Sequence, residues 1–258
     1  MNTLIETLAM ELRNAELSRF PVAPIIKSYP DLTVEDAYKI QILNIEKKLQ
    51  EGHIITGKKI GLTSLAVQRM LGVDLPGFGH LTDAMQVQNG IVPTDRLIQP
   101  KAEGEIAFLL KEDLKGPCVS AQDVLDATEY VMAAIEIADS RIADWKISIV
   151  DTVADNASSG MYIVSDKKVD PRTVDLKEIK MDFYRNGKWM NAGKGSDVLG
   201  NPAECVAWLA NTLSEFGVTL KKGEVIFSGA VSGMVTAEPG NCFRASFSEL
   251  GDIELRFE

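Results

Sequence analysis

Apolar side chains occupy every second position in residues 241–248 and again in residues 252–257, and this alternation limits the fold more than any other feature of the sequence. Successive side chains of a strand point to opposite faces, so the pattern predicts two half-buried antiparallel strands. Upstream, Asn186 and Gly187 lie between apolar segments, which predicts a hairpin over residues 180–191. The C-terminal part of the chain is therefore expected to form an antiparallel sheet.

The rest of the chain adds more strands and several helices. Further strands are expected near residues 54–62, 103–111, 131–138, 161–165 and 224–229. Leu4, Leu8, Leu12 and Ala15 recur at helical spacing, and other helices are expected over residues 34–50, 64–71, 120–129 and 202–216. The sequence thus predicts an α+β protein with a helical N-terminal portion (residues 1–53) and a mostly antiparallel, strand-rich core (residues 54–258).

The composition and charge exclude several classes of partner. The 258 residues carry a formal net charge of −10 and no stripe of Lys and Arg, which argues against a nucleic-acid partner. No apolar run reaches the roughly 18 residues of a membrane span, and the N-terminus carries acidic residues where a secretory signal has basic ones. We therefore expect no nucleic-acid or membrane partner and a cytoplasmic location.

The cysteines and histidines offer little for catalysis. Cys118, Cys205 and Cys242 are widely spaced without a CxxC pair, which favours reduced, buried thiols over disulfides or a zinc site. Only two histidines are present, His53 and His80, so chemistry that depends on a Ser-His-Asp relay is not favoured.

Acidic residues in apolar segments are the stronger candidates. Glu103 and Glu105 lie two residues apart on a predicted strand, so they project from the same face and repel each other unless a cation lies between them. Gly104 is expected to leave room beside the pair. Glu136 lies in another apolar strand candidate, where an unpaired charge is costly. Three carboxylates without a histidine form an oxygen-only set that suits Mg²⁺ or Mn²⁺.

A purely structural explanation of these acids remains open at this level. An E-x-E pair is also typical of a solvated strand edge, and Arg141 or a lysine would neutralise Glu136. In "GKKIGLTS" (residues 57–64), the glycines indicate backbone packed close to a ligand. Lys58 and Lys59 point to opposite faces, so we expect one at most to face the interior.

Two polar segments complete the candidates. "DTVADNASSG" (residues 151–160) is either an ordinary loop or the polar lining of a site. The glycine-rich "GKGSDVLG" (residues 193–200) lacks the spacing and the βαβ context of a phosphate loop, so it is interpreted as a turn.

Together these motifs resemble a known family over nearly the whole chain. "GKKIGLTS", "AEGEIAF", "EIADSRIADWK", "DTVADNASSG" and "VAWLANTL" are similar to the hydratase/decarboxylase family of aromatic meta-cleavage pathways, a branch of the fumarylacetoacetate hydrolase superfamily. The resemblance implies a distorted, mostly antiparallel β-barrel-like core with a helical N-terminal part. It also implies a homo-oligomer that acts on a small 2-oxo acid.

The resemblance further implies roles for individual residues. The expected ligands of Mg²⁺ or Mn²⁺ are Glu103, Glu105 and Glu136. The expected catalytic residues are Lys59 and Ser158. The expected substrate contacts are Gly61, Leu62 and Thr63.

Gly77 bears on which reaction of the family is expected. Hydratases typically have an aspartate in a Pro-Asp-aromatic-Gly motif where "LPGFG" has Gly77, and decarboxylases also lack that acid. "NAEL", "SYPDLT", "NASS" and the proline-free "GAVSGMV" also favour the decarboxylases, whereas "LTDAM", "AEGEIAF" and "VAWLANTL" are closer to the hydratases. Hydration benefits from an extra acid-base group, while decarboxylation needs mainly an electron sink. An aspartate would also repel a dianionic substrate.

The expected function is therefore a divalent-metal-dependent lyase that converts 2-oxohex-3-enedioate (4-oxalocrotonate) to 2-hydroxypenta-2,4-dienoate and CO₂. The alternative is the hydratase, which converts 2-hydroxypenta-2,4-dienoate to 4-hydroxy-2-oxopentanoate. A third hypothesis is a non-catalytic subunit that supports a pathway enzyme. A complex with the companion hydratase or decarboxylase is an accompanying expectation.

Overall fold

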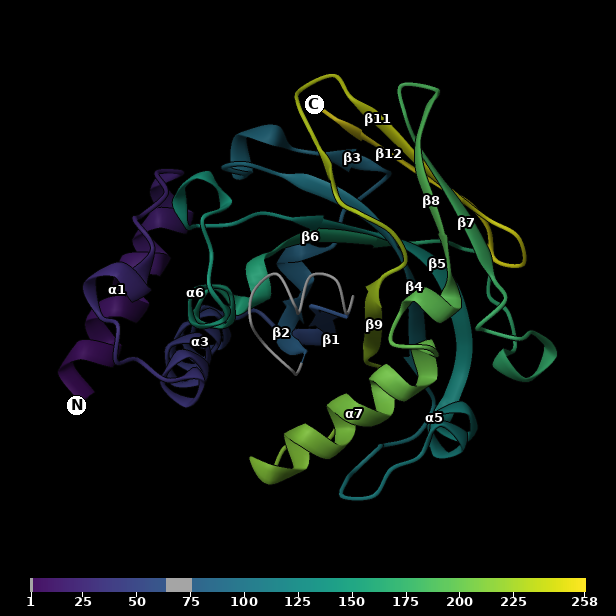
Figure 1. The fold of residues 1–258 in the computed structure, drawn as a ribbon, viewed down its shortest axis with the longest axis horizontal. Helices are drawn as coiled ribbons and strands as arrows, with labels where there is room; N and C mark the ends of the chain where they lie inside the picture. The colour runs from purple at the N-terminus through teal and green to yellow at the C-terminus, as the bar shows by residue number, and fades with distance from the viewer. Residues whose placement is uncertain (1, 64–75) are drawn as a thin grey trace.

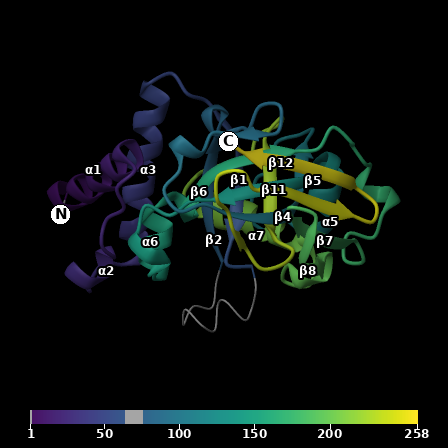
Figure 2. The same cartoon turned by 90° about the horizontal axis from the view of Figure 1, so that it is seen from above.

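The computed structural model describes residues 2–63 and 76–258, and it places a group of helices beside a strand-rich body (Figures 1 and 2). The larger sheet contains β1 (Ile55–Gly61), β2 (Gly77–Thr82), β4 (Lys101–Leu110), β5 (Thr128–Ala138), β6 (Ser159–Val164), β9 (Val225–Ala230) and β10 (Val235–Thr236). Its order is β2-β1-β9-β4-β5-β6, and β10 also pairs with β4. Neighbouring strands are antiparallel except β1 and β9, which run parallel.

The smaller sheet covers one face of the larger one. It contains β3 (Ile91–Val92), β12 (Gly251–Phe257), β11 (Cys242–Phe247), β7 (Lys180–Arg185) and β8 (Lys188–Lys194), in that order. The strands β7 and β8 form the hairpin that was predicted around Asn186 and Gly187, and only the β3–β12 pairing among the described strands of this sheet is parallel. The fold is therefore the predicted α+β arrangement with a curved, mostly antiparallel core.

Helices lie at two places on this body. The helices α1 (Asn2–Ser18), α2 (Ile25–Ser28) and α3 (Val34–Gln50) form one group, and Figure 2 shows them at one end of the molecule. They share an apolar cluster with α6 (Ile149–Ala154), which comes from the middle of the chain. The helices α5 (Ala121–Ala127) and α7 (Pro202–Glu215) pack against each other, and α7 also contacts β1 and β9.

Short 3₁₀ turns connect several of these elements. They are η1 (Asp83–Met85), η2 (Thr94–Arg96), η3 (Ala143–Trp145), η4 (Asn156–Ser158), η5 (Pro171–Thr173) and η6 (Gly195–Asp197). The turns η4 and η6 both contribute residues to the cavity of the candidate active site.

The strand β4 separates two environments. Ile106 and Phe108 face the main core, which includes residues of the smaller sheet and of α7, while Ala107 belongs to a smaller cluster on the opposite face. Glu103 and Glu105 share the face of Ala107, because side chains two apart in a strand point the same way. Gly104 faces the other sheet, where an added Cβ would lie 3.0 Å from Met181 Cε. The expectation that Gly104 makes room beside the glutamates was therefore wrong, since it lets the second sheet approach.

Most of the predicted elements are present with shifted ends. The predicted helix over 120–129 ends at Ala127, and residues 128–129 already belong to β5. Within "DTVADNASSG", residues 151–154 belong to the helix α6, which was not predicted. The predicted helix over 64–71 lies outside the described residues.

All three cysteines are free, but only Cys205 is buried, so the expectation of buried thiols was wrong for the exposed Cys118 and Cys242. No helix in the described part of the chain combines the length and apolar character that crossing a membrane requires.

Candidate active site

Three carboxylates converge where β4 and β5 pair. Glu103 lies directly across from Glu136 in the antiparallel register, and Glu105 follows on the same face of β4. Each of the three side chains offers an oxygen, and these oxygens all lie within 4.8 Å of one another. Lys59 reaches the group from β1, with Nζ 3.0 Å from Glu136 Oε1. Residues from three strands of one sheet thus meet in a single cluster.

The cluster is buried and strongly charged. Glu103, Glu105 and Glu136 are 7%, 1% and 0% exposed, and Lys59 is 4% exposed. Burial, together with the charge of Glu136, raises the pKa of Glu103 to about 8 and raises the pKa of Glu105 well above its ordinary value. Burial alone would lower the pKa of Lys59, but the surrounding carboxylates, Glu136 first, raise it above its usual value. Within the described residues, Lys59 is therefore the buried cation among three buried acids, and the less buried Lys101 also acts on Glu103.

This imbalance fits a site for a divalent cation. Despite the ion pair with Lys59, neither oxygen of Glu136 receives an aligned hydrogen bond from any described donor. Buried carboxylate oxygens are normally paired, and like charges this close are stabilised by a cation. An all-oxygen set of this kind suits Mg²⁺ or Mn²⁺.

Lys58 and Lys59 point to opposite faces of β1, as expected, but both are buried. Lys58 Nζ lies 2.8 Å from each carboxylate oxygen of Glu224. The prediction that at most one of these lysines faces the interior was wrong, because the far side of the sheet holds a second buried ion pair. Lys58 also contributes, after burial, to a His80 pKa of about 3, so His80 stays neutral near pH 7.

Ser158 is presented by a tight left-handed turn. Asn156, Ala157 and Ser158 have φ values of 53°, 52° and 53°, a region that non-glycine residues rarely occupy. The Asn156 side chain bridges this turn to β2, since Oδ1 accepts from His80 N at 2.8 Å and Nδ2 donates to His80 O at 2.9 Å. The approach is so close that a Cβ on Gly79 would lie 2.4 Å from Asn156 O.

Asp155, just before this turn, is the counter-ion of Arg141. Both are buried, and Arg141 Nε donates to Asp155 Oδ1 while the Arg141 backbone N–H donates to Oδ2 at 3.0 Å. Arg141 Nη1 also donates to Ser159 O at 2.7 Å. Arg141 is therefore committed to the turn, and Glu136, for which it was a candidate partner, is paired with Lys59 instead.

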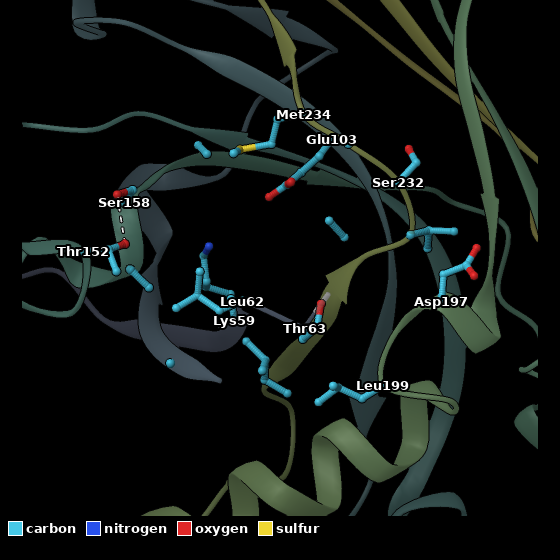
Figure 3. A pocket seen from close by; sticks show the side chains of 18 of the residues that line it. Lys59, Leu62, Thr63, Glu103, Thr152, Ser158, Asp197, Leu199, Ser232 and Met234 are labelled. Carbon is cyan, nitrogen blue, oxygen red and sulfur yellow. Dashed lines mark hydrogen bonds between the residues drawn. The ribbon is translucent and has the colours of Figure 1, made fainter. Parts of the chain in front are cut away.

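A cavity of about 750 Å³ opens beside the cluster (Figure 3). Its described lining includes the predicted site residues Lys59, Gly61, Leu62, Thr63, Glu103 and Ser158. Glu105 and Glu136 lie behind the wall rather than on it. In Figure 3 the Glu103 carboxylate and the Lys59 amine point into the same space.

Sequence reasoning missed several residues of this cavity. Trp145, Thr152 and Asp197 all line it, as do the apolar side chains of Ile147, Val153, Leu199 and Met234. Thr152 lies in a segment that was flagged as a polar lining, whereas Asp197 lies in the segment that was interpreted only as a turn. The turn interpretation holds for η6, but nothing local in the sequence shows that Asp197 lines the same cavity as Glu103.

Comparisons with known proteins identify the family of this chain. The model of the family described as "Fumarylacetoacetate (FAA) hydrolase C-terminal" matches residues 77–258. A 2-hydroxyhexa-2,4-dienoate hydratase of Comamonas testosteroni is 47% identical over 98% of this chain and 97% of its own length. A 2-hydroxypent-2,4-dienoate hydratase of Pseudomonas putida is 52% identical over 84% of this chain and 98% of its own length.

A solved structure matches nearly every element. The 4-oxalocrotonate decarboxylase of Pseudomonas putida G7, complexed with magnesium and adipate, superposes with a TM-score of 0.96 at 34% identity. The match covers 100% of this chain and 98% of that one. On the family match, the sequence identities and this shared fold, the chain belongs to the fumarylacetoacetate (FAA) hydrolase C-terminal family.

Proposed function

We propose that this chain is a divalent-metal-dependent lyase that adds water to 2-hydroxypenta-2,4-dienoate or a close homologue, giving a 4-hydroxy-2-oxo acid. The observation that carries the proposal is the buried carboxylate cluster with Lys59 beside a cavity large enough for a small acid. Relatives at 47% and 52% identity that carry hydratase names support the choice of reaction. Both the hydratase and the decarboxylase reactions of this family are lyase reactions.

Glu103, Glu105 and Glu136 would hold the ion, which we expect to be Mg²⁺ or Mn²⁺. When bound, the ion would supply Lewis-acid polarisation of the substrate's 2-oxo group. Glu105 is already oriented by its neighbours, because Oε2 accepts a hydrogen bond from Gly229 N at 2.8 Å. A magnesium complex of the structurally similar decarboxylase is consistent with this assignment.

Lys59 would act on the oxygen end of the substrate. Its ammonium group faces the cavity and remains protonated, because the three glutamates raise its pKa. A fixed cation at this place stabilises negative charge that develops on the enolate oxygen. Gly61, Leu62 and Thr63 continue from the same strand along the cavity wall and would contact the substrate. Ser158 would position an oxygen on the opposite wall.

The choice between hydratase and decarboxylase depends on two supports. The named hydratases are more similar in sequence than the decarboxylase, at 47% and 52% against 34% identity. The described cavity lining also holds Asp197, an acid that is not among the predicted site residues. An extra acid-base group of this kind suits hydration better than decarboxylation, which needs mainly an electron sink. The hydratase, our alternative at the sequence level, is therefore preferred.

Asp197 also weakens the argument drawn from Gly77. That argument supposed that no acid approaches the substrate, yet Asp197 lines the same cavity from η6. The Gly77 position is instead filled by α6, since an added Cβ there would lie 3.3 Å from Val153 Cγ2. The decarboxylase remains the second candidate because of the fold match at a TM-score of 0.96.

Assays of purified protein with both substrates test the proposal. With Mg²⁺ or Mn²⁺ present, we expect 2-hydroxypenta-2,4-dienoate to give 4-hydroxy-2-oxopentanoate, identified by NMR. Release of CO₂ from 2-oxohex-3-enedioate without turnover of the dienoate would overturn the proposal in favour of the decarboxylase. If neither substrate reacts with or without a companion enzyme, the chain is not a lyase of this type. The E105Q variant, which should lose turnover, controls for contaminating activity.

We also propose that the chain works as a homo-oligomer, as the family resemblance implies. Light scattering on the purified protein measures its mass directly, and repeating it with the companion decarboxylase tests for a hetero-complex. A monomeric mass at assay concentration would contradict the first expectation.

A further inference from the structure

Three polar side chains form a connected group on the cavity wall opposite Asp197. Thr152 on α6 and Ser158 on η4 both line the cavity, and their hydroxyl oxygens lie 3.3 Å apart (Figure 3). Behind them, the Ser158 hydroxyl donates to Asp155 Oδ2 at 3.4 Å. Thr152, Asp155 and Ser158 are 6%, 2% and 3% exposed, so bulk water does not compete strongly for these contacts.

The turn that creates this group is fixed from several sides. Its three consecutive left-handed residues are costly, and such strain persists only where surrounding contacts determine it. Arg141 supplies these contacts, because it bonds both the Asp155 carboxylate and the Asp155 backbone carbonyl. Ser140 Oγ adds a hydrogen bond to Asp155 Oδ2 at 3.2 Å. The protein thus maintains a strained conformation that points Ser158 toward the cavity.

The group has a defined direction of hydrogen bonding. Ser158 has a single hydroxyl proton, and an ionised carboxylate accepts but cannot donate. When Asp155 is ionised, Ser158 therefore donates to Asp155, and Thr152 donates to Ser158. The Ser158 oxygen then has a remaining lone pair, which can accept a proton only from the cavity side.

We propose that Ser158 and Asp155, with Thr152 donating a hydrogen bond to Ser158, form a proton relay that activates the water molecule added to the substrate. This inference rests on the proposed hydratase function and assigns its base. As the C–O bond forms at the fourth carbon of the 2-oxo-3-enoate form, the water O–H bond breaks and its proton passes to Ser158 Oγ. The Ser158 proton passes to Asp155 Oδ2, and the C3–C4 π electrons move toward the 2-oxo group. The proton then returns through Ser158 to the third carbon of the enolate, so the net change is one added water.

Within this scheme Ser158 is the catalytic residue and Asp155 is a positioning residue that acts through it. Burial raises the pKa of Asp155 to about 6, against the opposing charge of Arg141. Asp139 also raises it, while Glu16 from α1 and Lys48 from α3 reach the small polar cavity on its other side. Asp155 is then ionised near neutral pH and still basic enough to take a proton.

The balance of charge around Asp155 sets the direction of the pH effect. Below about pH 6 Asp155 gains a proton and becomes a donor to Ser158, which reverses the hydrogen bond and removes the acceptor. We expect kcat for hydration to fall as pH decreases through this range. The decrease should depend on Asp155 and Ser158 and not on surface groups.

Three variants and one control test the relay in the holoenzyme. S158A should lower kcat about 100-fold or more, since general-base catalysis contributes about 10² to 10⁴ in rate. T152V should lower it about tenfold, because one neutral hydrogen bond is lost. S159A is the matched control, as Ser159 directly follows the turn as the first residue of β6, its Oγ donates to Asn156 O at 2.7 Å, and it is not among the residues that line the cavity. S159A should retain the wild-type rate.

Two readouts separate a relay from a merely structural role. In S158A the residual rate should lose the acid limb near pH 6, and NMR should show the unhydrated 2-oxo isomer accumulating, because ketonisation does not need the relay. D155N should show the same flat acid profile, and its thermal melt establishes whether it is folded. If D155N does not fold, S158A still decides.

The outcomes distinguish failure of the relay from failure of the proposed function. Wild-type protein that does not hydrate the dienoate contradicts the function. Wild-type protein that hydrates it, with S158A keeping the full rate or an unchanged acid limb, overturns the relay alone. A loss of rate in S159A equal to that in S158A would also overturn it, because the turn and not the hydroxyl would then be responsible.

Discussion

Replacing Glu103 with Gln should stabilise the metal-free protein, although it removes a predicted ligand. The Glu103 carboxyl has a pKa of about 8 in the folded state, against an ordinary value of 4.5. A group with a raised carboxyl pKa binds more protons when folded, so it lowers stability as pH rises from about 4.5 to 8. The destabilisation is about 1 kcal/mol at pH 5 and about 4 kcal/mol at pH 8. A neutral Gln at this position does not ionise, so it does not cause this pH-dependent loss of stability.

The measurement is thermal or urea unfolding of chelator-treated protein at both pH values. The free energy of unfolding of E103Q should exceed that of wild type by about 3 kcal/mol more at pH 8 than at pH 5. For a domain of this size, this corresponds to roughly 6 to 12 °C in Tm. The control is E254Q, because Glu254 also lies in a strand but is exposed. E254Q should follow the wild-type pH dependence.

Adding metal should narrow the difference in stability between E103Q and the wild type. At about 100 times Kd a bound ion stabilises the wild type by roughly 2.7 kcal/mol, and E103Q should gain less because it lacks one ligand. If the free energies of unfolding of metal-free E103Q and wild type changed in parallel with pH, the reasoning would be refuted. Such a result would mean that Glu103 is not buried among like charges. Equal stabilisation of both proteins by metal would remove Glu103 from the ligand set.

Three further substitutions probe other parts of the site. K59M leaves Glu136 without the cation 3.0 Å away, so kcat for hydration should fall at least about 100-fold when loss of the dienoate is followed by its ultraviolet absorbance. A rate within about tenfold of wild type would contradict this. R141M leaves a buried acid without its counter-ion and should cost about 3 to 5 kcal/mol in urea unfolding; a loss below about 1 kcal/mol would show that the pair is not buried. G229A places a Cβ 2.3 Å from a threonine hydroxyl at φ +112°, so it should cost about 2 kcal/mol or more. G217A, with φ +70° and open space, should cost less, and equal losses would exclude the steric explanation.

Patterns with a short period were the part of the fold that sequence could predict. The hairpin of β7 and β8 depends on Asn186 and Gly187, and the acids of β4 share a face because of the two-residue repeat. The match of Glu103 with Glu136 across two antiparallel strands needed only the assumption that these strands pair. These features are local or nearly so, and the sequence encodes them directly.

The helix α6 was missed although its signal was present. Ser148 Oγ accepts from Asp151 N at 3.2 Å, and Asp151 Oδ2 accepts from Ser148 N at 2.9 Å, which is a capping box. The helix is only six residues long, and its polar residues obscured the apolar face that contacts α2 and α3. As a result, the segment that contains Thr152 was interpreted as a loop or a polar lining, and no function was predicted for Thr152 itself.

Long-range pairings could not be predicted from the sequence. Lys58 and Glu224 are 166 residues apart, and only the parallel pairing of β1 with β9 brings them together. The same holds for Asp197, which reaches the cavity because η6 follows the smaller sheet. Because the pairing of β1 with β9 could not be predicted, nothing in the sequence indicated that Lys58 and Lys59 are both buried.

The position of β9 has a consequence for how the protein is made. This strand is synthesised more than 160 residues after β1, yet it lies between β1, which carries Lys59, and β4, which carries Glu103. A nascent chain can pair β1 with β2 and β4 with β5 early, but each pair then presents an open edge until β9 leaves the ribosome. Such edges invite association with other chains, and pairings of this separation form slowly. Lys59 and the glutamates therefore meet only when the last third of the polypeptide has been translated.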